Sequence, residues 1–166
     1  MQSCFSEYSS PLGKLTLVAN GRGLAGVYFE HHAHFQGTAQ MQRNDHHPVF
    51  DLVREQLTAY FAGQRKSFSV PLDLSAGTAF QQQVWRLLAE IPYGETVSYG
   101  ALAEKLENPR AVRAVGAANG RNPFSILLPC HRVIASDGRL TGYAGGLKNK
   151  AFLLKFEASN QQLIAE

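Results

Sequence analysis

Cysteine is scarce in this sequence: the 166 residues contain two, Cys4 and Cys130. Two cysteines are too few for the disulfide framework of a small secreted protein, so we expect a reducing, cytoplasmic compartment. Long hydrophobic runs are also missing, and the N-terminus lacks a charged leader followed by an apolar stretch. We therefore expect no signal peptide, no membrane span and no membrane partner.

Acidic residues are absent from one long stretch of the second half. No Asp or Glu lies between Glu107 and Asp137. The arginines of that stretch are Arg110, Arg113, Arg121 and Arg132. Charges balance in residues 1–77, so the net charge of +3 comes entirely from residues 78–166. Such a local excess attracts a polyanion such as DNA, although a solvated basic face would have the same composition.

Residues 1–77 show the pattern of a small sheet with one helix. Alternating apolar residues predict strands over residues 5–8, 14–19, 24–29 and 68–74. An apolar helical pattern starts after Pro48, which suits a first helical turn, and ends before Gly63, which suits a helix stop. We expect residues 75–77 to link this sheet to the rest of the chain.

The intervening segment, residues 31–47, is polar, shows no clear period and holds all the histidines of the first half. Histidine side chains are common metal ligands, and Cys4 could add a sulfur ligand. No second cysteine in this half completes a structural zinc site, however. We therefore expect a loop that binds no metal.

Residues 78–166 have the pattern of a mostly helical unit. Thr78 and Gln81 predict a capping box at the start of a helix whose apolar face ends at Pro92-Tyr93-Gly94. A last helix is expected from Leu147 to about Glu157. Its predicted inner face contains Leu147, Ala151 and Leu154, and its predicted outer face contains Lys148, Lys150 and Lys155.

Two helices in the middle of this half predict a helix-turn-helix. Ser98 is expected to cap a short helix that reaches about Leu106, and Asn108-Pro109 is expected to begin the next after a short turn. One side of that helix contains Arg110, Arg113, Ala114 and Ala117, and the other Val112, Val115 and Ala118. Alanines let a helix approach closely, as entry into a minor groove about 6 Å wide requires. A tightly packed internal helix is the alternative.

The most reactive grouping is Cys130 beside His131, the only histidine of the second half. A thiolate attacks far better than a thiol, and a histidine base raises its share. Neighbouring side chains of an extended segment point to opposite faces, so this pair needs a bend or a bridging water to share a proton. Glu157 is a candidate third member behind His131. A buried structural cysteine beside a surface histidine is the alternative.

The segment Pro129-Cys130-His131-Arg132-Val133 resembles the active-site signature of the O6-alkylguanine-DNA alkyltransferases, also called methylated-DNA--protein-cysteine methyltransferases. Further matching segments are residues 92–99, 113–116, 122–123 and 143–146, and Leu153-Leu154 followed by Glu157. The specific part covers roughly the second half of the chain. The first half is compatible through Ser10-Pro11-Leu12-Gly13-Lys14 and Tyr60-Phe61. The sequence is most like the constitutive bacterial type, which has no fused regulatory domain.

The resemblance implies an α+β protein with two domains. Residues 1–77 would form a ribonuclease-H-like sheet domain, and residues 78–166 a winged-helix-like domain that binds duplex DNA through the minor groove. The implied activity is DNA repair: an alkyl group moves from O6-alkylguanine to Cys130 after the base has flipped out of the helix. The sequence leaves open whether O4-methylthymine is also a substrate. We expect a monomer that needs no cofactor and acts once per molecule.

The same resemblance implies a role for each site residue. Cys130 would accept the alkyl group, His131 would act as a base through a water molecule, Glu157 would orient His131, and Asn122 would brace the turn. The residues implied to contact DNA or the flipped guanine are Tyr99, Asn108, Arg113, Ser136, Tyr143 and Ala144. Among them, Tyr99 would press on a phosphate and Arg113 would fill the space that the base vacates.

Two other classes of protein explain part of the pattern. A cysteine hydrolase would use Cys130, His131 and Glu157, but it needs an oxyanion hole and leaves the helix-turn-helix without a role. A non-catalytic DNA-binding regulator uses the helix-turn-helix but leaves the thiol without a role. Covalent modification of Cys130 by an alkylated duplex separates both from the alkyltransferase.

Overall fold

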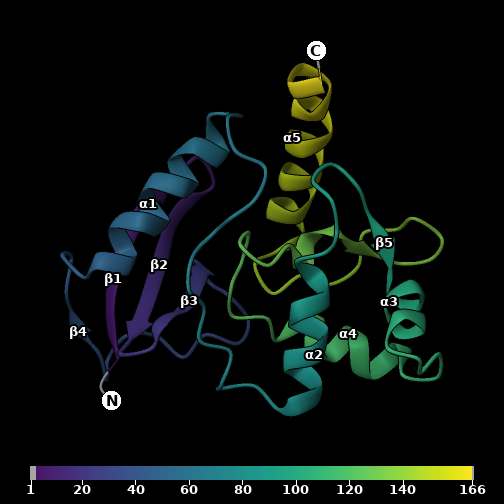
Figure 1. Ribbon diagram of the computed structural model, residues 1–166, viewed down its shortest axis with the longest axis horizontal. Helices are drawn as coiled ribbons and strands as arrows, with labels where there is room; N and C mark the ends of the chain where they lie inside the picture. Colours follow the sequence, from purple (N-terminus) through teal and green to yellow (C-terminus); the bar gives the residue numbers. More distant parts are fainter. Residues whose placement is uncertain (1–2, 166) are drawn as a thin grey trace.

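The computed structural model describes residues 3–165, which form a sheet domain followed by a mostly helical domain (Figure 1). The elements are β1 (Cys4–Ser10), β2 (Gly13–Asn20), β3 (Gly23–Phe29), β4 (Gln42–Arg43), α1 (Pro48–Phe61), α2 (Ala79–Leu88), β5 (Val97–Ser98), α3 (Tyr99–Lys105), α4 (Val112–Gly120), the 3-10 turn η1 (Cys130–Arg132), β6 (Val133–Ile134) and α5 (Leu147–Ala165). This segregation of strands and helices confirms the α+β class. Within the described residues, none of the helices combines the length and apolarity that crossing a membrane would require.

The first domain is a four-stranded sheet in the order β3-β2-β1-β4, with α1 lying across one face (Figure 1). The pairs β1–β2 and β2–β3 are antiparallel, as the tight turns between them predict. Leu15 and Leu17 of β2 and Val53 and Leu57 of α1 are fully buried. Their burial removes apolar surface from water and holds the helix on the sheet.

Helix α1 begins and ends where its sequence predicts. Pro48 occupies the first turn, and the side chain of His47 accepts a hydrogen bond from the backbone N–H of Val49 at 3.2 Å. Gly63 follows the helix with a φ of 75°, a left-handed conformation that glycine adopts without strain. The local chemistry of these residues is sufficient to define the helix.

The strand predicted over residues 68–74 does not form, and only Leu72 makes a bridge, to Leu24 of β3. The carbonyl of Pro71 accepts from the N–H of Leu24 at 2.9 Å, and the N–H of Asp73 donates to the carbonyl of Leu24 at 2.8 Å. Proline has no N–H of its own to donate, so the pairing cannot extend before Leu72, and after Leu24 the edge of β3 is taken by Pro123 and Ser125, which bond to Val27. That prediction was wrong because proline interrupts an otherwise alternating pattern.

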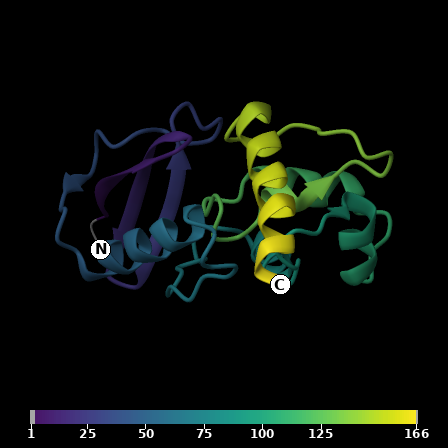
Figure 2. The ribbon, with the colours of Figure 1, turned by 90° about the horizontal axis from the view of Figure 1, so that it is seen from above.

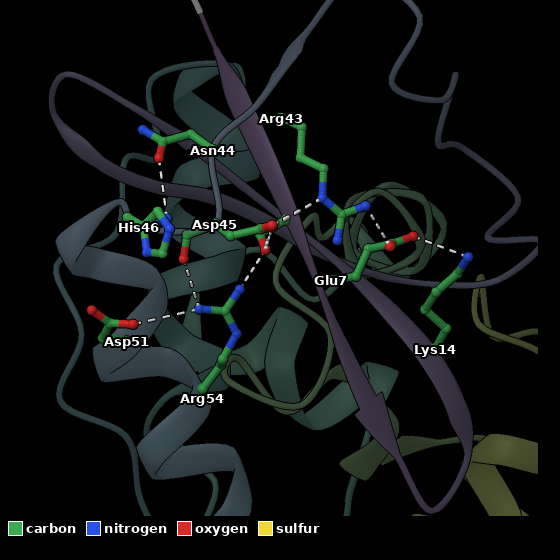
Figure 3. A network of polar contacts seen from close by, with 9 residues as sticks. Glu7, Lys14, Arg43, Asn44, Asp45, His46, Asp51 and Arg54 are labelled. Carbon is green, nitrogen blue, oxygen red and sulfur yellow. Dashed lines mark hydrogen bonds and ion pairs between the residues drawn. The ribbon is translucent and has the colours of Figure 1, made fainter.

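The polar segment 31–47 was predicted to be a loop throughout, but it contains β4, which pairs with β1 in parallel. The network in Figure 3 explains how an exposed two-residue strand is held. Arg43 donates to Glu7 at 2.8 Å and to Asp45 at 3.0 Å. Asp45 also accepts from Ser6 of β1 at 2.5 Å. Polar contacts, which apolar periodicity does not detect, thus place β4 on the sheet.

Two helices of the second domain, α2 and α3, begin at the capping residues that the sequence predicts. The N–H of Gln81 donates to the Thr78 hydroxyl at 3.1 Å and the N–H of Thr78 donates to the Gln81 side chain at 2.9 Å, which completes the capping box. Ser98 caps α3 by accepting from the N–H of Ala101 at 3.0 Å. Both signals span three residues, so tertiary packing is not needed to explain them.

Helix α4 begins later than predicted, at Val112, and its N-cap Ala111 makes no side-chain capping bond. Glu107 has a φ of 59°, and the carbonyl of Asn108 accepts from the N–H of Ala111 at 3.0 Å, so the chain makes an extra turn before the helix. The expected cap at Asn108 was therefore wrong. Val112 is 40% exposed rather than packed inward, because it lies in the first turn at the helix end.

The buried face of α5 also differs from the prediction. Lys150, Leu153 and Glu157 are buried, whereas Leu147 and Ala151 are exposed. Positions three and four apart share a helix face, so these buried residues form one line along α5. The prediction placed the apolar face of the helix inside, but the buried face in the structure includes two charged side chains. Both views place α5 between the sheet domain and helices α3 and α4 (Figures 1 and 2).

Candidate active site

Cys130 lies at the start of the 3-10 turn η1, with Pro129 immediately before it. Cys130 and His131 therefore lie in a turn and not in an extended segment. Cys130 is 5% exposed. Its N–H donates to the carbonyl of Leu128 at 2.7 Å, and its carbonyl accepts from the Asn119 side chain at 3.3 Å. The backbone that carries the thiol is therefore fixed on both sides.

Asn122 fixes the segment that leads into this turn. Its side-chain amide donates to the carbonyl of Leu128 at 2.8 Å and to that of Phe124 at 3.3 Å. Its side-chain oxygen accepts from the N–H of Phe124 at 3.0 Å. With 1% of Asn122 exposed, these bonds replace water at a buried backbone. The geometry supports the bracing role that the resemblance implied.

His131 and Glu157 form a buried pair. His131 Nε2 lies 2.9 Å from Glu157 Oε2, and neither side chain is more than 1% exposed. Arg132 adds a bidentate contact to the same carboxylate, at 2.8 Å from Nε to Oε1 and 3.0 Å from Nη2 to Oε2. Tyr60 Oη donates to Glu157 Oε2 at 2.6 Å. Glu157 is thus the centre of a network that joins η1, α5 and α1.

The charges of this network follow from its surroundings. Burial by itself would raise the pKa of Glu157, but hydrogen bonds and charges from His131 and Arg132 outweigh it and lower this pKa to about 2. Burial lowers the pKa of His131, although Glu157 partly opposes the shift. The pair therefore consists of a carboxylate and a neutral imidazole whose Nε2–H donates to it. This assignment leaves Nδ1 as the basic nitrogen.

The free nitrogen of His131 matters for the neighbouring thiol. Nδ1 is buried and has no hydrogen-bond partner among the residues that the structure describes. Burial raises the pKa of the Cys130 thiol, while Asn122, Lys150 and Tyr143 act in the opposite direction. A thiol with a raised pKa needs a base to form the thiolate. His131 Nδ1, which has no other partner among the described residues, is the candidate base, and the resemblance implies that it acts through a water molecule.

Lys150 is a buried cation that the sequence pattern assigned to the outer face of its helix. Its Nζ donates to the carbonyl of Val133 at 2.7 Å and to that of Thr141 at 3.2 Å. Burial lowers its pKa, and the nearby Cys130 opposes this effect. Lys150 thus ties the strand after Cys130 to the loop that follows it. Because it lies among lysines in a polar stretch, the sequence contains no signal that separates it from surface lysines.

Arg132 was counted in the predicted basic face, but it is 5% exposed and turned inward. Besides Glu157, it donates to the carbonyl of Ile91 at 2.7 Å and lies over the ring of Tyr93 at 5.6 Å. That part of the charge prediction was wrong, because the Glu157 carboxylate and the carbonyl of Ile91 accept the hydrogen bonds of the buried guanidinium in place of water. Tyr60 and Asn119 were also missed as members of this site.

The loop after β6 brings Tyr143 to the site. Burial raises the pKa of Tyr143 well above its ordinary value, and the nearby Cys130 adds to that shift. Its ring meets Phe29 of β3 edge-on at 6.2 Å, and the carbonyl of Ala144 accepts from the N–H of Ala33 at 2.9 Å. The sheet domain therefore supports the segment that was expected to contact guanine.

The remaining predicted contacts lie nearer the surface. Tyr99 is half-buried and its hydroxyl shares a hydrogen bond of 2.9 Å with Thr141. Arg113 is exposed on the first turn of α4, Asn108 is exposed in the connection before it, and Ser136 is exposed in the turn after β6. The structure thus gathers Cys130, Asn122, His131 and Glu157 in the interior, with Tyr143 half-buried beside them. It leaves Arg113, Asn108 and Ser136 accessible to a large partner.

No metal centre is built into this arrangement: in the described part of the chain, no group of three or more His, Cys, Asp or Glu side chains could hold a metal ion. His32 is buried, and its Nδ1 accepts a hydrogen bond from the N–H of His34 at 3.2 Å. The acceptor nitrogen is therefore already used within the loop. Both cysteines are free thiols.

Comparison with known proteins decides the family. Residues 79–159 match the model of the 6-O-methylguanine DNA methyltransferase DNA binding domain, and residues 4–74 match the model of its ribonuclease-like domain. The chain belongs to this methyltransferase family. The methylated-DNA--protein-cysteine methyltransferase of Methanosarcina acetivorans is 46% identical over 159 residues, which cover 93% of this chain and 98% of that protein.

Solved structures of 6-O-methylguanine DNA methyltransferases have the same fold. The crystal structure of the Mycobacterium tuberculosis O6-methylguanine methyltransferase has a TM-score of 0.86 and 44% identity, covering 96% of this chain and 94% of that one. Mycobacterium tuberculosis OGT in complex with DNA has a TM-score of 0.87 and 44% identity, covering 95% and 94%. These comparisons confirm the family that the sequence resembles.

Proposed function

We propose that this protein repairs duplex DNA by transferring the alkyl group of O6-alkylguanine to the sulfur of Cys130. The observation that carries the proposal is the arrangement of η1. A nearly buried thiol lies beside a histidine whose Nε2 is held by Glu157 and whose Nδ1 is left as a base. Membership of the family supplies the substrate class.

The reaction is a substitution at the alkyl carbon. The Cys130 proton moves to His131 through a bridging water molecule, and the Glu157 carboxylate stabilises the imidazolium that forms. The thiolate then attacks the alkyl carbon, the carbon–O6 bond breaks, and guanine leaves with the bonding electron pair and takes up a proton. The product at Cys130 is a thioether, which water does not readily cleave. Each molecule therefore acts once, and no cofactor enters the scheme.

The base must leave the duplex before its alkyl group can reach a thiol that is 5% exposed. We propose that α4 enters the minor groove through its accessible side, on which Arg113, Ala114 and Ala117 are exposed. Arg113 would fill the vacated stack and Tyr99 would press on a phosphate. Residues assigned to the remaining contacts with DNA or the flipped guanine are Asn108, Ser136, Tyr143 and Ala144.

We also propose the division into domains and the compartment. The sheet domain would comprise residues 1–77 and the DNA-binding domain residues 78–166, which agrees with the segments that the two family models match. An alkyl acceptor must be a reduced thiol, and both cysteines are free. A reducing cytoplasm is the compartment that keeps them so.

Titration tests the proposal. A fixed amount of protein is incubated with increasing duplex that contains O6-methylguanine, and repaired guanine is counted. We expect a plateau at one guanine per active protein, with one methyl group on the peptide that contains Cys130. A cysteine hydrolase would form a thioester that water can cleave, and so would turn over. Repair far beyond one equivalent, or an unmodified Cys130 peptide, would rule out the proposal.

A further inference from the structure

We infer that Tyr60, in the sheet domain, is a positioning residue for alkyl transfer that acts on His131 through Glu157. This inference rests on the proposed function. It gives the first domain a part in the chemistry, although every reacting group belongs to the second. The contacts of Tyr60, its rigid surroundings and the charge of Glu157 each support it.

Tyr60 shares an acceptor atom with the base. Its Oη donates to Glu157 Oε2 at 2.6 Å across a separation of 97 residues. The same oxygen pairs with His131 Nε2 at 2.9 Å and accepts from Arg132 Nη2 at 3.0 Å. A stronger or weaker hydrogen bond from Tyr60 therefore changes how strongly this oxygen accepts the hydrogen bond from His131.

The ring of Tyr60 is held rigidly. It is fully buried at the junction of α1 and α5. Its aromatic neighbours are Phe61 at 5.1 Å, Phe68 at 5.6 Å, Phe156 at 5.6 Å and Tyr93 at 6.2 Å, measured between ring centroids. Burial and the adjacent carboxylate raise its pKa, so the phenol remains a proton donor. A donor fixed in this way restrains rotation of the Glu157 carboxylate.

The electrostatic effect has a definite sign. A hydrogen bond donated to a carboxylate stabilises its charge and lowers its ability to attract a second proton. Without the Tyr60 hydroxyl, Glu157 would pull more strongly on the Nε2–H of His131. The imidazolium would then be more stable and the pKa of His131 would rise. His131 must be neutral to accept the thiol proton. As the pH falls, the variant would therefore begin to lose activity at a higher pH than the unmodified protein does.

The experiment compares Tyr60→Phe with Tyr8→Phe. Tyr60→Phe keeps the ring and removes only the hydroxyl. Tyr8→Phe is a matched control in the same domain, because the Tyr8 hydroxyl pairs with Thr58 at 3.0 Å and not with the site. The rate of Cys130 methylation by free O6-methylguanine base is measured from about pH 5 to about pH 9. The free base removes DNA binding and base flipping from the comparison.

We expect the acid limb of the pH profile to move upward by up to about one pH unit in Tyr60→Phe and not to move in Tyr8→Phe. A purely structural role would lower the amount of active protein without shifting the limb. In a Glu157→Gln background, Tyr60→Phe should change the rate by less than about twofold, because the negative charge through which Tyr60 acts on His131 is gone.

A second change covers the case in which Tyr60→Phe does not fold. Replacing Tyr60 alone with 3-fluorotyrosine keeps the ring and makes the phenol a stronger donor. The acid limb should then move to lower pH. Two results would overturn the inference. One is an acid limb that does not move in a folded Tyr60 variant. The other is an effect of Tyr60→Phe that is the same in the Glu157→Gln background as in the unmodified protein. If the unmodified protein transfers no methyl group at all, the proposed function fails instead.

Discussion

The Nζ of Lys150 on α5 lies 2.7 Å from the carbonyl oxygen of Val133, which follows the turn that carries Cys130. The same Nζ donates to the carbonyl of Thr141 at 3.2 Å. One buried ammonium group therefore joins the end of the active-site turn to the loop that leads to Tyr143. This contact has a consequence for both stability and activity.

Lys150→Met should destabilise the protein by about 2 kcal/mol, because two buried carbonyls lose their donor while the apolar stem is kept. Transfer to Cys130 should slow as well, since β6 and the following loop lose their connection. Lys148→Met is the control, because Lys148 is exposed on the same helix. That change should alter the free energy of unfolding by less than about 0.5 kcal/mol. Urea unfolding followed by circular dichroism compares the two, and equal effects would contradict the proposed contact.

Cys130→Ser should abolish alkyl transfer and leave the affinity for duplex DNA nearly unchanged. A hydroxyl beside His131 is a much weaker nucleophile than a thiol but has a similar shape. Cys4→Ser is the control: Cys4 lies on β1 of the sheet domain and should be dispensable for transfer. Intact mass after incubation with O6-methylguanine duplex measures transfer, and a gel-shift titration measures binding. Loss of DNA binding in Cys130→Ser would show that Cys130 mainly holds the fold.

Arg113→Ala should slow repair of duplex DNA by about tenfold or more, because base flipping costs a few kcal/mol that Arg113 is proposed to offset. Reaction with free O6-methylguanine base should be almost unaffected, since a free base need not be flipped. Arg86→Ala removes the same charge from an exposed position on α2 and serves as the control. Equal slowing on duplex and free base would indicate damage to the pocket instead.

Asn122→Asp should destabilise the protein by about 2–3 kcal/mol, although the two side chains have almost the same shape. The aspartate would keep the acceptor for the N–H of Phe124 but would turn an oxygen toward the carbonyl of Leu128, where the amide now donates at 2.8 Å. Asn44→Asp is the matched control, because Asn44 is exposed and uses only its acceptor oxygen, toward His46. Thermal unfolding of both variants at neutral pH would show whether the donor matters.

The folded protein should lose stability as the pH falls below 6.5, and His32 should account for part of the loss. Burial, with a smaller effect from the charge of His34, lowers the pKa of His32 from 6.5 to about 4. Between these values the unfolded chain binds a proton that the folded chain does not, so stability falls as pH decreases, by at most about 3 kcal/mol. Urea unfolding at several pH values should show a flatter dependence for His32→Gln. The exposed His46→Gln should keep the original dependence.

Local sequence determined several elements by itself. The capping box of Thr78 and Gln81, the Ser98 cap and the limits of α1 all depend on hydrogen bonds or backbone angles within a few residues. The partners in these contacts are close in sequence, so the sequence is enough to predict them. The Cys130–His131 pair is equally accessible to prediction, because its resemblance to the family signature lies in five consecutive residues.

Predictions of which charged side chains are exposed failed where distant residues decide the outcome. Apolar periodicity assigned Lys150 to the outer face of α5, and charge counting assigned Arg132 to a basic surface. Both side chains are buried, because carbonyls or a carboxylate from other segments satisfy their charge. Those partners are far away in sequence, so neither residue differs locally from an exposed lysine or arginine.

The tertiary structure alone decided how the active site is completed. The sequence determined that a thiol and an imidazole are adjacent, which is a covalent fact of neighbouring residues. It did not determine that Tyr60 meets Glu157 from the other domain, which depends on α1 and α5 packing against each other. The physical reason is that hydrophobic patterns specify which faces are buried, whereas a hydrogen bond depends on distances of a few tenths of an ångström that only the packed chain defines.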